Sequence, residues 1–301
     1  MKNKLLTITL VLVVLLGIGL MLYKPVMQHF IIPKVHDHIS EKTKKTPVST
    51  YDKNNKDVNK ALKDYYKKNK ISYDGTKFSD QMANGAFKDG FNLNGKDSSY
   101  PHGLGKNGDG GSSGTGDSNG SSYEGLPNIT FDYGQVKAVG HSDLSNINTH
   151  YDKRLLTGHI ALPSLGVSMP VLEGVSNTNL YVGAGTLKPF QQMGKGNYAL
   201  ASHHMPDEYS NFSRIGQLQK GSMILLSDGH KVYEYRTSSV KNMPTRSSHV
   251  VDDVPGKKMV TLVTCYNTYG SADRNGNARI VVQGDFVKTH SMHSDYGQYF
   301  R

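Results

Sequence analysis

Cysteine is nearly absent from this sequence, since Cys265 is the one such residue among 301. A single thiol cannot form a disulfide within the chain, and it excludes a structural zinc site built on several thiolates. If the protein is exported, a lone cysteine is either a small buried side chain or a free reactive thiol. Cys265 is therefore a candidate nucleophile and, equally, a candidate core residue.

Apolar and acidic residues are also scarce. Only 36% of the residues are hydrophobic and 32 are glycine, which indicates one folded domain rather than two in a chain of this length. The formal net charge is +10. Its lysines concentrate between Lys24 and Lys96, where a shortage of apolar residues is typical of a solvated segment, and no nucleic-acid-binding motif accompanies them. We therefore expect no nucleic-acid partner.

One hydrophobic run, from Leu5 to Tyr23, is long enough to cross a bilayer as a helix. The alternative is a cleaved signal peptide, but the run exceeds the usual apolar core of such peptides and no site of small residues follows it. Lys2 and Lys4 lie on its short N-terminal side, so we expect the body of the protein outside the cytoplasm. Residues 1–24 are predicted to be a single-pass membrane anchor.

Residues 25–128 are rich in Lys, Asn, Asp, Ser and Gly, and the extreme is the glycine-serine run from Gly103 to Ser122. This composition predicts a flexible extracytoplasmic linker with a reach on the order of 50 Å. A short helix is conceivable over residues 60–70, although the string shows no face wide enough to bury. Two glycine motifs in the linker match dinucleotide and serine-hydrolase patterns, but neither follows a strand, so both are discarded.

From residue 129 to 301 the composition changes to short runs of Val, Ile, Leu and Tyr, separated by Gly, Pro, Asn and Asp. Regular short strands predict an all-β domain, either a sandwich or a barrel. Brief helices are expected only over residues 177–184 and 210–218. The predicted strands are residues 159–162, 167–172, 198–202, 223–227, 231–237, 259–266 and 279–286.

Cys265 lies at the C-terminal end of a strand, where functional side chains often emerge, although a buried and inert position remains open. A thiol nucleophile needs a proton partner and donors for the oxyanion. His203 follows directly on an apolar strand, and its neighbour His204 would point to the opposite face. A metal site is the rival interpretation, but two adjacent histidines are poor joint ligands and no third ligand has suitable spacing. We expect no metal.

Arg279 opens the last strand and offers fixed donors for an oxyanion, with Arg274 in the preceding loop as its competitor. The combination of TLVTC ending at Cys265, ASHH around His203 and RIVV from Arg279 resembles the sortase family, and is most similar to its class A, housekeeping type. The resemblance covers roughly residues 155–287.

This resemblance implies a closed eight-stranded β-barrel in which His203, Cys265 and Arg279 converge as catalytic residues. At matching motif positions, it also implies that three residues line the substrate groove: Ala201, Val263 and Thr264. The loop 188–197 lacks the acidic residues with which some class A members bind calcium, so we expect no calcium requirement and no cofactor.

The implied activity is that of a cysteine transpeptidase at a Gram-positive cell surface. It would cleave LPXTG-like sorting signals between Thr and Gly, and pass the thioacyl product to the amine of a lipid II-type peptidoglycan precursor. If the pKa values of Cys265 and His203 stay near their references of about 8.5 and 6.5, only a minority of molecules holds the thiolate–imidazolium pair.

Two alternatives stay open. A pilin-polymerising sortase would usually carry an aromatic-containing lid and a second C-terminal membrane span, whereas the tail from His290 to Arg301 is polar. The non-enzymatic alternative is a membrane-tethered β-barrel binding module in which Cys265 is structural.

Overall fold

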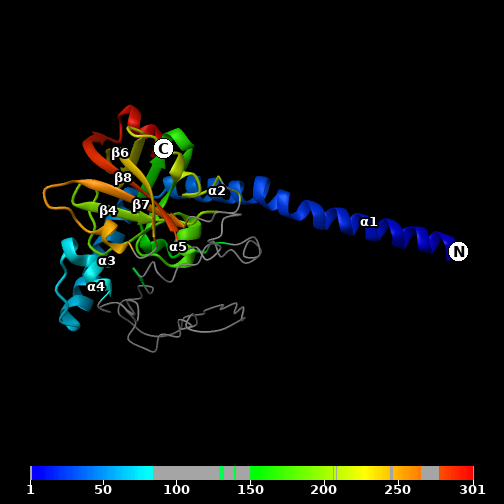
Figure 1. Cartoon of the computed structure of the whole chain (residues 1–301), viewed down its shortest axis with the longest axis horizontal. Helices are drawn as coiled ribbons and strands as arrows, with labels where there is room; N and C mark the ends of the chain where they lie inside the picture. Colours follow the sequence, from blue (N-terminus) through cyan, green and yellow to red (C-terminus); the bar gives the residue numbers. More distant parts are fainter. Residues whose placement is uncertain are drawn as a thin grey trace.

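The structure is a computed structural model that describes residues 2–83, 129–131, 139, 150–205, 207, 209–244, 247–265 and 278–300. It consists of a β-barrel, a layer of N-terminal helices packed on the barrel, and one long helix that projects away from both (Figure 1).

Eight strands close the barrel in the order β1-β2-β3-β4-β7-β8-β6-β5. This confirms the predicted all-β, eight-stranded barrel. The strands are β1 (Leu156–Leu162), β2 (Val167–Leu172), β3 (Ala184–Thr186), β4 (Asn197–Ala201), β5 (Met223–Ser227), β6 (Lys231–Pro244), β7 (Met259–Cys265) and β8 (Ala278–Ser291).

Strand alternation separates the two faces of β4, β7 and β8. Leu200 of β4, Leu262 of β7 and Val282 of β8 lie side by side in the register and form part of the barrel core. Their neighbours along each strand face outward, and these include Ala201, Val263 and Val281 in a separate apolar cluster. The outer face of this part of the barrel is therefore also apolar and covered.

Two details of the barrel differ from the prediction. Strand β3 was not predicted, because its three residues are too few to show an alternating pattern. The helix expected over residues 210–218 is reduced to the 3-10 turn η7 (Ile215–Gln217). The backbone explains this, since Asn211 has a φ of 53° and forms an isolated bridge with His204, which is incompatible with a helix there.

The other short helices connect strands. The helix α5 (Asn177–Val182) confirms the predicted helix at this place, and the carboxyl end of the chain forms η9 (Asp295–Phe300). Phe300 is buried against Ala161, Leu225 and Val232 on the barrel. The remaining 3-10 turns are η5 (Lys153–Leu155), η6 (Pro163–Leu165) and η8 (Ser248–Val251).

Helix α1 (Lys2–Val26) continues through the π-helical turn η1 (Met27–Ile31) into α2 (Ile32–Lys44). The part of this helix that is apolar enough to cross a membrane is exposed over its whole length, as Leu16 at 68% and Leu20 at 70% illustrate. A soluble core helix would bury such residues. The apolar N-terminal helix is thus consistent with a membrane anchor.

The predicted flexible linker begins at residue 25, but residues 25–31 continue the N-terminal helix, and the linker prediction is also wrong for residues 32–83. This stretch forms α2, α3 (Val48–Lys68), η2 (Gly75–Lys77) and α4 (Phe78–Ala83), which we call the helical layer. Helix α3 buries a stripe at intervals of three or four residues: Tyr51, Asn54, Val58, Leu62 and Tyr66. Lysines, aspartates and asparagines make up most of the remaining positions of the helix, and they mask this narrow stripe in the composition. The other half of the predicted linker, residues 84–128, lies outside the described residues.

The helical layer is joined to the barrel by specific polar contacts as well as apolar ones. The amide of Asn54 donates to the carbonyl oxygens of Lys153 and Leu156, both at 2.8 Å. On β1, the buried imidazole of His159 lies 3.1 Å from the Tyr51 hydroxyl and 2.8 Å from the Thr43 hydroxyl. Burial lowers the pKa of His159 to about 3, so this interface holds the neutral imidazole.

Candidate active site

The C-terminal ends of β4 and β7 bring the predicted catalytic positions to one edge of the barrel. These two strands are parallel and paired at Ala201 and Val263, so both end at the same edge. The link continues past the strand, because the Ser202 amide donates to the Val263 carbonyl at 3.2 Å. His203 therefore starts its loop beside the end of β7.

Cys265 and Arg279 face each other across the antiparallel pair β7–β8, where their Cα atoms are register partners. Arg279 also pairs with Met243 of β6 and is buried at 8% exposure. The sulfur of Cys265 lies outside the described part of the chain, as does the competitor Arg274. The backbone thus brings two of the three predicted catalytic residues to adjacent positions.

His203 is buried, with 1% of its surface exposed. Its ring lies against that of Tyr181 on α5, with 4.5 Å between centroids, and its backbone amide donates to the Leu180 carbonyl. Burial lowers the pKa of His203 to about 3, the nearby His36 of α2 adds to the effect, and the adjacent Asn177 backbone opposes it. The reference pKa assumed from the sequence is therefore not what this environment produces, and the neutral imidazole is the resting form.

The three predicted groove residues divide into two kinds. Ala201 and Val263 belong to the outer apolar cluster, against which Val250 and Val251 of η8 also pack. Thr264 is fully buried and its hydroxyl donates to the Ser202 carbonyl at 2.9 Å. Thr264 of β7 thus binds the backbone that follows β4, directly before His203.

The loop that lacks acidic residues contributes a buried cation. Lys188 is 1% exposed, and its ammonium lies 2.5 Å from a carboxylate oxygen of Asp253, in the loop before β7. Burial lowers the pKa of Lys188, while the charge and hydrogen bond of Asp253 oppose this shift. Among the described residues, no group of three or more His, Cys, Asp or Glu side chains could hold a metal ion. Calcium independence stays a prediction.

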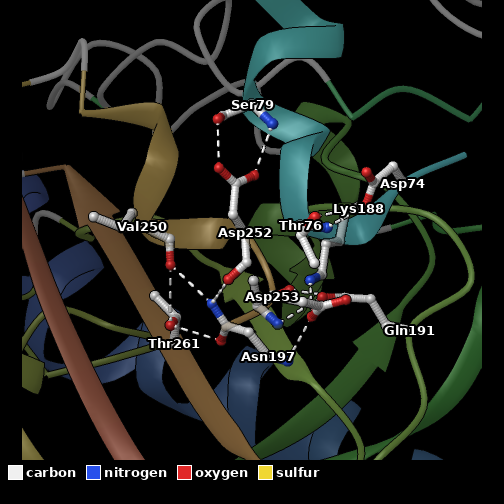
Figure 2. A network of polar contacts seen from close by, with 11 residues as sticks. Asp74, Thr76, Ser79, Lys188, Gln191, Asn197, Val250, Asp252, Asp253 and Thr261 are labelled. Atoms are coloured by element: carbon white, nitrogen blue, oxygen red, sulfur yellow. Dashed lines mark hydrogen bonds and ion pairs between the residues drawn. The ribbon is translucent and has the colours of Figure 1, made fainter. Parts of the chain in front are cut away.

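A polar network that was not predicted from the sequence surrounds this lysine, as Figure 2 shows. Asp253 accepts from the Asn197 amide at 2.7 Å, and the preceding Asp252 accepts from the amide and hydroxyl of Ser79 on α4. These residues are scattered over the helical layer, the β3–β4 loop and the β6–β7 loop. A single sequence offers no local signal that would group them.

Comparison with known proteins assigns the barrel to a family. A sortase domain model matches residues 160–287. Sortase A of Bacillus anthracis is 39% identical over 152 residues, which cover 50% of this chain and 70% of that protein. This chain belongs to the sortase family. Sortase A of Listeria monocytogenes is 34% identical over 163 residues, covering 54% of this chain and 71% of that protein.

Among solved structures, sortase A of Listeria monocytogenes aligns with 35% identity over 48% of this chain and 97% of that chain, with a TM-score of 0.44. The curated relatives confirm the class A assignment, and the chain is a sortase cysteine transpeptidase. A purely structural binding module is thereby set aside. The family match begins in β1, so the helical layer of residues 32–83 lies outside it.

Proposed function

We propose that this sortase cleaves LPXTG-like sorting signals between Thr and Gly and transfers the threonyl end to the amine of a lipid II-type peptidoglycan precursor. Family membership makes the chain a transpeptidase that anchors surface proteins. The observation that supports this substrate and mechanism is the convergence of strand ends. Cys265 lies opposite Arg279, and the backbone just before His203 is bound to the end of β7.

In the first half-reaction, the Cys265 sulfur attacks the threonine carbonyl carbon while its proton passes to His203. The carbonyl oxygen becomes an oxyanion, to which the Arg279 guanidinium donates. The carbon–nitrogen bond then breaks, and the imidazolium of His203 returns the proton to the departing glycine amine. A thioester on Cys265 and a free glycine peptide result.

In the second half-reaction, the acceptor amine attacks the thioester carbonyl. Its surplus proton passes to His203 and then to the departing Cys265 sulfur, so thiol and neutral imidazole are restored. The buried, neutral state of His203 suits this cycle, since the imidazole must accept a proton before it can donate one. No cofactor is needed for either step.

We further propose that α1 anchors the enzyme in the cell membrane as a single pass, with the barrel outside the cytoplasm. The helix is apolar and exposed, and it continues through η1 into α2 (Figure 1). Helix α2 packs on β2. Such an arrangement holds the barrel close to the bilayer, where a lipid-linked acceptor would be found.

The test uses the full chain in detergent micelles with a library of LPXTG peptides and an added amine. We expect mass spectrometry to detect an acyl adduct on Cys265, which Cys265→Ala abolishes together with cleavage. Arg279→Lys should lower kcat by about 10²-fold or more, the scale of losing an oxyanion donor. Arg154→Lys is the matched control, because Arg154 is exposed and its guanidinium pairs with Asp152 beside it on the surface.

The pH dependence of alkylation adds a second test. With a neutral His203 and an unperturbed thiol, the alkylation rate of Cys265 should fall steadily as the pH drops below about 8.5. Full reactivity that persists to pH 5 would instead show a stable thiolate–imidazolium pair and refute the neutral resting state.

A further inference from the structure

The helical layer is fastened to the loop between β6 and β7 at one place. Asp252 of that loop accepts a hydrogen bond from the Ser79 amide at 2.7 Å and another from the Ser79 hydroxyl at 2.5 Å. The Asp253 amide donates to the Gly75 carbonyl at 2.8 Å. We call these three hydrogen bonds the clasp, and Figure 2 shows the two between Ser79 and Asp252.

The clasp joins the loop at the residue that follows η8. Directly before it, Val250 and Val251 pack on the outer cluster that contains Ala201 and Val263. The Val250 carbonyl accepts from the Asn197 side-chain amide at 2.8 Å and from the Thr261 hydroxyl at 3.3 Å. The turn η8 therefore packs on the cluster to which the two predicted groove residues belong, and it is held on the side of the barrel by Asn197 of β4 and Thr261 of β7.

Asp252 and Asp253 attach the loop in two directions. The Asp253 carboxylate binds the barrel through the Lys188 ammonium and the Asn197 amide, whereas the Asp252 carboxylate binds Ser79 on α4. Ser79 lies in the first turn of α4, where unpaired amides and the helix dipole favour a carboxylate. The loop is thus bound to the barrel through Asp253 and to the helical layer through Asp252.

Close packing at the clasp leaves little freedom. A Cβ atom on Gly75 or on Gly196 would collide with the Asp253 carboxylate. Gly196 has a φ of 50°, a conformation that glycine adopts without strain. Gly75 and Gly196 both approach the Asp253 carboxylate without a side chain between them. A small displacement of η2 and α4 would therefore also move the loop.

We propose that Ser79 and Asp252 are positioning residues for peptide binding, through which η2 and α4 hold η8 against the outer cluster that contains Ala201 and Val263. This inference rests on the proposed sorting-peptide activity. When the hydrogen bonds of the clasp are broken, η8 is free to move. The side of the predicted groove that η8 supports then loses its fixed position. Binding of the peptide then weakens, while the chemistry at Cys265 and Arg279 is unchanged.

The variants Ser79→Ala and Asp252→Asn test this in the full chain. Each should raise KM for an LPXTG peptide about five- to tenfold, the scale of one ordinary hydrogen bond lost, with kcat changed less than about twofold. The double variant should be no worse than the more severe single one, because the two residues act through one contact. Ser79→Thr keeps the hydroxyl and should restore the KM.

The matched control is Asp57→Asn, which removes an exposed carboxylate of the same helical layer, on α3, and should leave KM unchanged. Two readouts separate positioning from general loss of structure. Alkylation of Cys265 by iodoacetamide should stay within about twofold of wild type, and hydrogen exchange at the amides of Val250 and Val251 should accelerate in the Ser79 and Asp252 variants alone.

Unchanged KM and unchanged exchange in both variants would overturn the proposal. So would a parallel loss of kcat and of alkylation, since this would mean that the clasp supports the whole fold. Failure of the proposed function is distinct from both outcomes, because the wild-type enzyme itself would then form no acyl adduct with any peptide of the library.

Discussion

The barrel and the helical layer are held together by different distributions of apolar residues. In the barrel, nearly continuous apolar strands bury side chains on both faces of β4 and β7, with Leu262 inside and Val263 outside. In the helical layer, α3 is mostly polar and buries one narrow stripe around Leu62. A segment that is poor in apolar residues can thus be fully ordered, provided the few that it has share one face.

The two regions also bury histidines for different purposes. His159, at the interface between them, lies within hydrogen-bonding distance of the hydroxyls of Tyr51 and Thr43, while His203, which follows β4, lies against the Tyr181 ring. Burial lowers both pKa values to about 3. The first imidazole joins two layers of the fold, and the second is proposed to carry protons.

The largest expected effect compares the two cores directly. Leu262→Ala in the barrel and Leu62→Ala in α3 each remove a fully buried leucine, and each should lower the free energy of unfolding by about 2–5 kcal/mol. Denaturant unfolding measures the total. Hydrogen exchange should show that Leu62→Ala loosens α3 before the barrel, whereas simultaneous loosening of both regions would mean that they form one cooperative unit.

Acidification should weaken the interface next. Because the pKa of His159 is about 3 in the folded protein and about 6.5 when unfolded, the unfolded chain binds more protons between these values. Its contribution is complete above pH 6.5 and is lost as the pH falls towards 3. The loss between pH 7 and pH 4 is up to about 3 kcal/mol.

Thermal unfolding of wild type and His159→Gln across this pH range measures the effect. The variant should be less dependent on pH than wild type, and the remaining dependence should include that of His203. An identical pH dependence in both proteins would contradict the assignment of this loss of stability to the interface histidine.

A smaller effect compares two ion pairs. Lys188→Met leaves the Asp253 carboxylate without its buried ammonium and should cost about 2 kcal/mol, below the usual 3–5 for fully buried pairs because Asp253 is 30% exposed. Lys53→Met breaks an exposed, solvent-screened pair with Asp57 on α3 and should lower the free energy of unfolding far less. Chemical denaturation checks both, and equal losses would refute the distinction.

The smallest expected effect is that of calcium. Since Lys188 supplies a positive charge in the loop before β4, chelation with EDTA or addition of calcium should leave the peptide KM within about twofold of the untreated value. A calcium-dependent fall in KM for wild type would contradict this expectation. The same calcium measurement on Lys188→Met is the comparison, because this variant removes the cation that pairs with Asp253.

Most of the barrel was predictable because its strands carry strong local signals. Strands β2 and β5 begin and end at the predicted residues, and α5 begins where it was expected. The missed elements are those in which local preference is weak or overruled, such as the three-residue β3 and the helical stripe of α3 hidden among lysines and aspartates. The expected helix over residues 210–218 gave way to the bridge between His204 and Asn211.

The sequence by itself determined the barrel, the apolar N-terminal helix and the family motifs around His203, Cys265 and Arg279, because periodicity and motif spacing are local properties of a chain. Only the tertiary structure decided that residues 32–83 pack on the barrel, that His203 is buried, and that Asp252 reaches Ser79. Such contacts join residues far apart in the sequence, and their energies depend on burial and on partners that no local pattern specifies.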